Sequence, residues 1–185
     1  LGLGHQHLQS TPEGKYDDQP CREESLVVTA DARLDNRDEL FDALSMSDSS
    51  SRVPDSQLLL AAFRKWKEQC VDHLIGAYAF VIWDGSAKRL FFARDHFGVK
   101  PLYYCISEDV FAVASEIKAL LALPSVPGIV NETKVGDFLL RQFEDKEITF
   151  YESIQRLPPA NAAFVSTDGE QTWQYWDLDP TREVA

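Results

Sequence analysis

The sequence predicts an α+β fold, in which antiparallel strands joined by short turns pack together with helices. Two patterns predict it. Apolar, β-branched and aromatic runs follow one another in pairs with turn residues between them, which is typical of hairpins. Helical patterns stand between groups of these strands and not after every strand, which disfavours a parallel, doubly wound sheet. A length of 185 residues indicates one domain, since domains commonly have about 100–200 residues.

The first half of the chain predicts one strand followed by two helices. Leu40, Phe41 and Leu44 stand at helical spacing, and Asp35 or Asn36 can cap the helix that they define. The apolar stripe of the second helix indicates a side that packs on the core, and the Ser-rich stretch before it is expected to be a surface loop. The expected elements are a strand at 25–30, a helix ending at 44, a loop at 45–52 and a helix at about 58–68, capped by Asp55-Ser56-Gln57.

The second half predicts two hairpins, two helices and a late pair of strands. Asp84-Gly85 is a strong turn signal between two apolar runs. Pro124 stops the first helix, because proline cannot continue a helix. The expected elements are strands at 77–83 and 90–93, a loop at 95–101, strands at 102–106 and 110–114, helices at 115–121 and 135–143, an ordered connection at 154–159, strands at 162–165 and 173–176 around a turn at 167–169, and a polar tail at 179–185.

Composition excludes several classes of function. Thirty acidic and 18 basic side chains give a formal net charge of −12, which argues against nucleic-acid binding by bulk positive charge. We expect no membrane span, because no apolar run approaches the roughly 20 residues that a helical span needs. Cys21, Cys70 and Cys105 are odd in number and form no CxxC pair, so a zinc site or disulfide framework is not expected. Free thiols and the absence of a visible signal peptide predict a reducing, cytoplasmic location.

Generic motifs leave two alternatives open. The sequence has no GxGxxG motif, P-loop or GxSxG elbow. His5 and His7 would share one face of a strand, but no further metal ligand stands at suitable spacing, so a pocket or surface role is favoured and no metal is expected. Arg94-Asp95-His96 could be an acid–base cluster, although a structural ion pair after a strand is the more common meaning of such a loop.

An ordered set of segments carries a resemblance that covers nearly the whole chain. The segments from 94 to 104 and from 114 to 120 are its most specific part. Together the segments closely resemble the N-terminal glutaminase-type domain of the glutamine-dependent asparagine synthetase family. In order, they are Gly4-His5-Gln6-His7-Leu8, Gln19-Pro20, Asp31-Ala32-Arg33-Leu34-Asp35-Asn36, Asp55-Ser56-Gln57, Gly76-Ala77-Tyr78-Ala79-Phe80, Arg94-Asp95-His96-Phe97-Gly98-Val99-Lys100-Pro101-Leu102-Tyr103-Tyr104, Ala114-Ser115-Glu116-Ile117-Lys118-Ala119-Leu120 and Tyr175-Trp176.

The resemblance implies an N-terminal-nucleophile fold, a four-layer αββα sandwich of two antiparallel sheets. Residues 1–178 would be the class II glutamine amidotransferase-like domain, without its first strands, and 179–185 would begin a linker to a synthetase domain. In active members a cysteine at the mature N-terminus attacks the amide of glutamine, and ammonia travels to a second domain that uses ATP. The family's nucleophile precedes the His5 segment, so none of the three cysteines takes its place and no catalytic residue is expected in this chain.

The resemblance also places a glutamine pocket, at positions where the chain mostly departs from the family. His7 stands where the family has an arginine that holds the glutamine carboxylate, and imidazole lacks that permanently charged fork. Asp31 and Ala32 stand at the oxyanion-hole asparagine and its neighbouring glycine, and a carboxylate has no donor for an oxyanion. Arg33 replaces a glutamate that binds the amine of glutamine. Asp55 is the family's other amine-binding carboxylate and is retained.

Three functions therefore remain under consideration. The first is the N-terminal domain of an ATP-dependent, amide-forming ligase with degenerate glutamine hydrolysis, as in β-lactam synthetases and lasso-peptide cyclases. The second is a working glutaminase domain of an asparagine synthetase, which would require Met-Cys-Gly upstream. The third is a non-catalytic interaction or scaffold domain. The expected partner is a synthetase domain that uses ATP and Mg²⁺; this domain would hold no cofactor, glutamine is a weak candidate ligand, and a second copy of the chain is another candidate partner.

Overall fold

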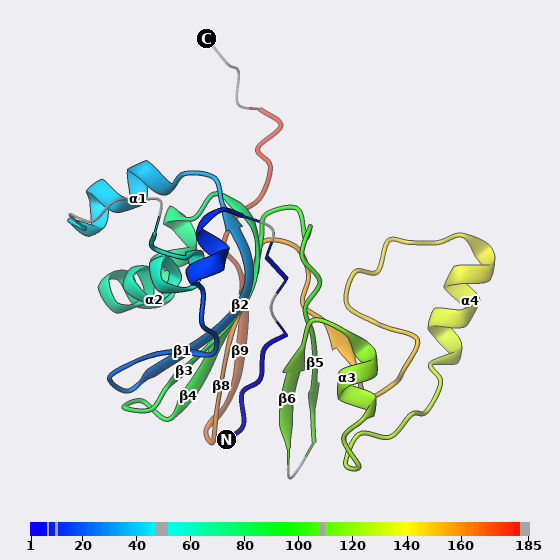
Figure 1. Ribbon diagram of the computed structural model, residues 1–185. Coiled ribbons are helices and arrows are strands. Elements are labelled where there is room, and N and C mark those ends of the chain that lie inside the picture. Colours follow the sequence, from blue (N-terminus) through cyan, green and yellow to red (C-terminus); the bar gives the residue numbers. More distant parts are fainter. Residues whose placement is uncertain (7, 10, 47–51, 108–109, 182–185) are drawn as a thin grey trace.

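Six strands form the larger sheet of the computed structural model, which describes residues 1–181 except 7, 10, 47–51 and 108–109 (Figure 1). Neighbouring strands are antiparallel throughout, in the order β1-β2-β3-β4-β8-β9. The strands are β1 (Cys21–Glu23), β2 (Leu26–Leu34), β3 (Gly76–Asp84), β4 (Arg89–Arg94), β8 (Asn161–Ser166) and β9 (Gly169–Gln174). Alternating residues of the central strands are buried on both faces, so this sheet has a layer on each side.

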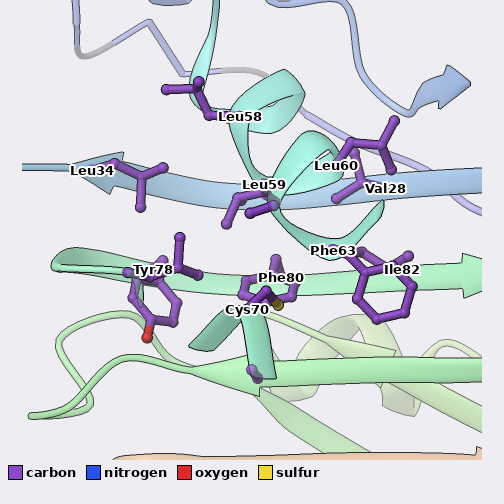
Figure 2. Packing of buried hydrophobic residues seen from close by; sticks show 14 of the residues in the cluster. Val28, Leu34, Leu58, Leu59, Leu60, Phe63, Cys70, Tyr78, Phe80 and Ile82 are labelled. Carbon is purple, nitrogen blue, oxygen red and sulfur yellow. The ribbon is translucent and has the colours of Figure 1, made fainter. Parts of the chain in front are cut away.

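Two helices cover one face of this sheet. They are α1 (Arg37–Leu44) and α2 (Asp55–Trp66), and the 3₁₀ helix η2 (Lys67–His73) follows α2. Phe63 of α2 stacks on Phe91 of β4 with ring centroids 5.2 Å apart. The apolar stripe of α2 meets the inward residues of β2 and β3, as Figure 2 shows. Burial of this stripe explains why the segment is helical.

A three-stranded sheet covers the other face. Its order is β6-β5-β7, with β5 (Tyr103–Ile106), β6 (Phe111–Ala114) and β7 (Gln155–Arg156). Phe92 of β4 packs on Tyr104 of β5 with centroids 5.6 Å apart, and Leu157 is buried between the sheets. The helix α3 (Ile117–Leu121) buries Leu120 against the far side of this sheet. The expected four-layer αββα arrangement of two antiparallel sheets is confirmed.

Two further elements lie outside the four layers. The 3₁₀ helix η1 (Glu13–Tyr16) belongs to the N-terminal segment, and α4 (Glu132–Leu140) stands beside the smaller sheet on long connections (Figure 1). Among the described residues, no helix is both long and apolar enough to pass through a membrane.

Several predicted boundaries were wrong. The strand expected at 25–30 continues to Leu34, because its pairing with β3 runs on to Gly76. The strand expected at 173–176 is β9 and begins at Gly169; apart from Trp173 its side chains are polar and exposed, so it has no apolar alternation to detect. The helix expected at 135–143 is α4, three residues earlier at each end. β1 and β7 were not predicted, and part of the loop expected at 45–52 lies outside the described residues.

Candidate functional site

A cavity of about 610 Å³ lies where the N-terminal segment, the larger sheet and β6 meet. β2 contributes Asp31 and Ala32 to it, and the first residue of α2 contributes Asp55. These three residues are among the predicted pocket positions, and the structure brings them to one cavity. His7 lies outside the described residues, and Arg33 is not among the lining residues.

Asp31 forms an ion pair with Lys100 inside this cavity. The alternation of β2 points Asp31 towards the smaller sheet, because the neighbouring Ala30 packs on the helical side. Lys100 Nζ lies 2.6 Å from Asp31 Oδ1, and their side chains are 28% and 51% exposed. The Asp31 carboxylate in this cavity is therefore already paired with a cation.

Two neighbouring side chains bind the backbone of Lys100 and hold this residue in place. Asp95 accepts a hydrogen bond from the Lys100 N–H at 2.9 Å, and Arg94 Nε donates to the Lys100 carbonyl at 2.6 Å. Asp95 also accepts from the N–H groups of Phe97 and Val99. The loop from 95 to 101 is thereby closed on two buried charged side chains, which fixes the point from which Lys100 reaches Asp31.

Arg94 and Asp95 therefore have a structural role, as in the second alternative for the Arg94-Asp95-His96 segment. They do so by binding backbone atoms, and not as a simple ion pair with each other. Arg94 also donates to the carbonyls of Gly98 and Leu157, at 2.6 and 2.7 Å. Such bonds satisfy a buried charge without a catalytic role.

Asp55 is a buried carboxylate with several partners. It is 5% exposed, accepts a hydrogen bond from the Leu34 N–H at 3.1 Å and forms an ion pair with Arg37. Arg37 Nη2 also donates to the Val53 carbonyl at 2.5 Å. Burial raises the pKa of Asp55, and the Leu34 N–H and Arg37 oppose that rise. The carboxylate thus ties α2 to the end of β2.

Arg33 does not line the cavity. Its guanidinium binds the Asp35 carboxylate through two bonds of 3.0 and 3.2 Å, and its side chain is 60% exposed. The resemblance implies a glutamate where this chain has Arg33. The positive charge of Arg33 therefore lies on the surface of the described domain and not inside the cavity.

Sequence reasoning missed several polar residues that line the cavity, although His5, for which a pocket or surface role was favoured, is one of the lining residues. Ser56 Oγ lies 2.5 Å from Asp17 Oδ1, and His5 Nδ1 lies 3.4 Å from Thr29 Oγ1. Gln19 pairs its side-chain amide with the backbone of Ala30. Lys100 stood inside the most specific segment of the resemblance, which was the available signal for it. The other contacts join segments distant in sequence, so no local pattern could have identified them.

The three cysteines are free, as the sequence predicted, and none lines the larger cavity of the described structure. Burial raises the pKa of the Cys21, Cys70 and Cys105 thiols. A raised thiol pKa lowers the fraction of nucleophilic thiolate.

Within the described part of the chain, His, Cys, Asp and Glu side chains form no group of three or more that could hold a metal ion.

Comparisons with known proteins agree with this architecture. A family model described as "Glutamine amidotransferase domain" matches residues 1–176. Asparagine synthetase [glutamine-hydrolyzing] 3 of Bacillus subtilis is 33% identical over 187 residues, which cover 98% of this chain and 30% of that protein. Amidase chyE of Penicillium rubens is 28% identical over 183 residues, which cover 97% of this chain and 26% of the amidase. The chain therefore spans less than a third of these two relatives.

Solved structures support the fold. The glutamine phosphoribosylpyrophosphate amidotransferase from B. subtilis has a TM-score of 0.58 at 19% identity, over 85% of this chain and 32% of that one. A glutamine aminotransferase class-II domain protein from Silicibacter pomeroyi has a TM-score of 0.52 at 16% identity, over 88% of this chain and 72% of that one. At such low identity the likeness is evidence of a shared N-terminal-nucleophile-type fold alone.

Proposed function

Because the chain belongs to the glutamine amidotransferase domain family, on its asparagine synthetase branch, we propose that it is the N-terminal domain of an ATP-dependent, amide-forming ligase with degenerate glutamine hydrolysis. The domain would comprise residues 1–178, with a linker beginning at 179. A following synthetase domain would use ATP and Mg²⁺ to activate a carboxylate. The domain described above would hold no cofactor.

The Lys100–Asp31 ion pair is the observation that carries this proposal. Hydrolysis of the glutamine amide develops negative charge on the amide oxygen, which an active site stabilises with a preorganised donor. Asp31 offers no donor and would repel the oxyanion. The loss of one such donor typically costs about 3 kcal/mol in transition-state stabilisation, and a fixed negative charge should cost more. Lys100 is already bound to that carboxylate, 2.6 Å away.

The other pocket positions support the same conclusion. Asp55 is engaged by Arg37 and by the Leu34 N–H, so its retained carboxylate supports the fold as it stands. Arg33 pairs with Asp35 outside the cavity. An α-amine of glutamine would have to compete with Arg37 for Asp55 and would find no second carboxylate at position 33. The charges of the cavity thus differ at these positions from the pattern that the resemblance implies for glutamine binding.

An amide-forming ligase can do without this step when the substrate itself supplies the amine. Ammonia from glutamine is then unnecessary, and the pocket is free to diverge while the domain remains as a folded part of the enzyme. Framework residues such as Arg94 and Asp95 would then keep the family pattern, while Asp31 and Arg33 are free to depart from it.

The test is a glutaminase assay on the full-length parent protein with its native N-terminus. We expect ammonia release from glutamine at the background rate. The B. subtilis enzyme named glutamine-hydrolysing asparagine synthetase 3 serves as the positive control. Ammonia release at a rate comparable to that control would overturn the proposal.

A working glutaminase is the second candidate, favoured by the retained Asp55 and by 33% identity to a relative named as glutamine-hydrolysing. It requires Met-Cys-Gly at the true N-terminus, so the upstream reading frame decides it directly. A scaffold role without a ligase would be favoured by a reading frame that ends near residue 185. An SGGxDS-type motif downstream would remove that alternative.

A further inference from the structure

Two neighbouring residues at the end of the fold are held in different ways. The Tyr175 N–H donates to a backbone carbonyl just before β8 at 2.9 Å, and the Tyr175 hydroxyl donates to the Arg94 carbonyl at 2.7 Å. Trp176 is half-buried, and its ring makes edge contacts with the rings of His96 and Phe97, at centroid distances of 5.1 and 5.5 Å. We call these two rings the Trp176 seat. Hydrogen bonds to the backbone therefore fix Tyr175, whereas the place of the Trp176 ring depends on its seat.

The tail that follows Trp176 starts from this contact. Residues 177–181 are exposed and lead away from both sheets (Figure 1). The Asp177 and Asp179 carboxylates accept hydrogen bonds from N–H groups one and two residues further on, at 2.8 and 2.9 Å. Such local bonds shape the tail but do not attach it to the fold. The position of the Trp176 ring therefore sets the direction in which the chain leaves.

The Trp176 seat and Lys100 belong to the same loop, at 95–101. Phe97 is 74% exposed, so the seat lies on the outer side of this loop. Three residues later, Lys100 reaches the larger cavity and lies 2.6 Å from Asp31 Oδ1. One part of the loop therefore supports the start of the tail, and the other carries the ion pair of the cavity.

Shared hydrogen bonds join these two parts into one unit. The Asp95 carboxylate accepts from the N–H groups of both Phe97 and Lys100, at 3.1 and 2.9 Å. The Arg94 guanidinium donates to the carbonyls of Gly98 and Lys100, both at 2.6 Å. Gly98 has φ 65°, and a Cβ there would lie only 2.9 Å from the guanidinium carbon. Because packed, hydrogen-bonded units have discrete arrangements and do not deform continuously, a shift of Lys100 would be passed on to Phe97.

We propose that the 95–101 loop couples the Lys100–Asp31 ion pair to the seating of Trp176. An intact pair keeps Trp176 on its seat, and a broken pair releases the ring together with the tail. A ligand that draws Asp31 away from Lys100 would thus change the direction in which the chain leaves the fold. The inference goes beyond the proposed function, because it requires neither glutamine nor a further domain.

Fluorine NMR of the full-length parent protein, labelled with fluorotryptophan, tests the coupling from the cavity to the tail. Trp176→Phe identifies the Trp176 resonance by its loss. We expect Lys100→Met and Asp31→Asn each to move this resonance towards its position in the urea-unfolded protein, because one breaks the pair from the loop and the other from β2. Trp66, whose ring stacks on His73 at 4.0 Å, is the reference, and its resonance should stay in place.

Lys118→Met is the matched control. The Lys118 ammonium lies 2.5 Å from Glu116 Oε2, and Glu116 lines the same cavity. Lys118 belongs to α3 and not to the loop. The variant therefore removes the same charge beside the same cavity, and it should leave the Trp176 resonance where it is. Circular dichroism verifies that each variant keeps the fold.

The reverse direction is measured at Lys100, because coupling between two sites is reciprocal. Trace reductive dimethylation, read by mass spectrometry, reports how readily each lysine amine reacts. Trp176→Ala should raise the labelling rate of Lys100 at least about twofold, which corresponds to about 0.4 kcal/mol. The labelling rate of Lys118 should not change.

Four results would overturn the coupling: a Trp176 resonance that neither cavity variant moves, an equal movement with Lys118→Met, a movement with Lys100→Met but not with Asp31→Asn, or an unchanged Lys100 labelling rate in Trp176→Ala. The third result would mean that Lys100→Met only damages the loop locally. None of these measurements uses glutamine or ATP, so their outcome is independent of the glutaminase assay that tests the proposed function.

Discussion

Lys100 Nζ lies 2.6 Å from Asp31 Oδ1, so the ammonium from the loop before β5 meets the carboxylate from β2 inside the larger cavity. Both backbone groups of Lys100 are held, by Asp95 and by Arg94. The pair therefore depends on a framework that the fold supplies, and on a carboxylate for which the resemblance implies a neutral amide in the family. Its consequences can be measured separately for stability and for ligand binding.

The first prediction concerns the contribution of this pair to stability. Asp31→Asn should change the free energy of unfolding by less than about 1 kcal/mol, because half-exposed ion pairs contribute about 0–1 kcal/mol. Lys100→Met and the double variant complete a double-mutant cycle by urea denaturation. A coupling energy above about 2 kcal/mol would contradict a pair whose main effect is on the chemistry of the cavity.

The second prediction concerns Arg37. Arg37→Met should destabilise the domain by about 3–5 kcal/mol, because it leaves the buried Asp55 carboxylate without its charged partner. Arg64→Met is the matched control, since Arg64 pairs with Glu23 on the surface, where the side chains are 53% and 43% exposed. That control should cost less than about 1 kcal/mol. Equal losses for the two variants in urea denaturation would show that the Asp55 pair is not structural.

The third prediction concerns Asp95. Asp95→Asn should cost about 2–4 kcal/mol, because a buried side chain that accepts from several N–H groups would then present an amide NH₂ to some of them. The loop at 95–101 should also loosen. Faster hydrogen exchange of the Val99 and Lys100 amides, measured by NMR, is the expected signature, since both donate to Asp95 at 2.9 Å. Unchanged exchange at these amides would refute the role of Asp95 as the anchor of Lys100.

The fourth prediction concerns pH. Burial lowers the pKa of His96, and the charge of Asp95 opposes that shift. As the pH falls, the unfolded chain, whose histidine pKa is near 6.5, binds a proton at this position before the folded protein does. The contribution of neutral His96 to the free energy of unfolding is therefore complete above about pH 6.5. It is lost as the pH falls through the lower pKa of the folded protein.

His96→Phe isolates that effect. Phenylalanine keeps a ring against Tyr175 and Trp176, whose centroids lie 5.4 and 5.1 Å from that of His96, but cannot titrate. Free energies of unfolding between pH 7 and pH 5 should therefore fall less steeply for the variant than for the native protein. Identical slopes would remove His96 as a source of the pH dependence.

The sequence predicted the fold best where burial is regular. The strands at 77–83 and 90–93 and their Asp84-Gly85 turn correspond to β3 and β4, because both faces of these strands are apolar. The start of α4 was placed too late, although the Asn131 side chain caps it by accepting the Lys134 N–H at 3.2 Å. Its end was missed because Arg141 takes the left-handed conformation, with φ 57°, where a glycine would have been recognisable.

The candidate site was predictable only in part. Resemblance located Asp31, Ala32 and Asp55, which line one cavity. It could not show that Arg33 pairs with Asp35 outside that cavity, because alternation puts Arg33 on the same face of β2 as Asp31, and only the structure shows that its guanidinium binds Asp35. The ion pair between Lys100 and Asp31 is a tertiary contact with no local sequence signal.

Equilibrium binding of glutamine to the full-length protein with its native N-terminus shows whether the pocket has lost glutamine, because binding depends on the pocket and not on the nucleophile. Isothermal titration calorimetry should detect no saturable binding up to about 10 mM glutamine, beyond the roughly 1 mM upper range of ordinary Michaelis constants. Saturable binding with a Kd below about 1 mM, abolished by Asp55→Asn, would contradict a pocket that has lost glutamine.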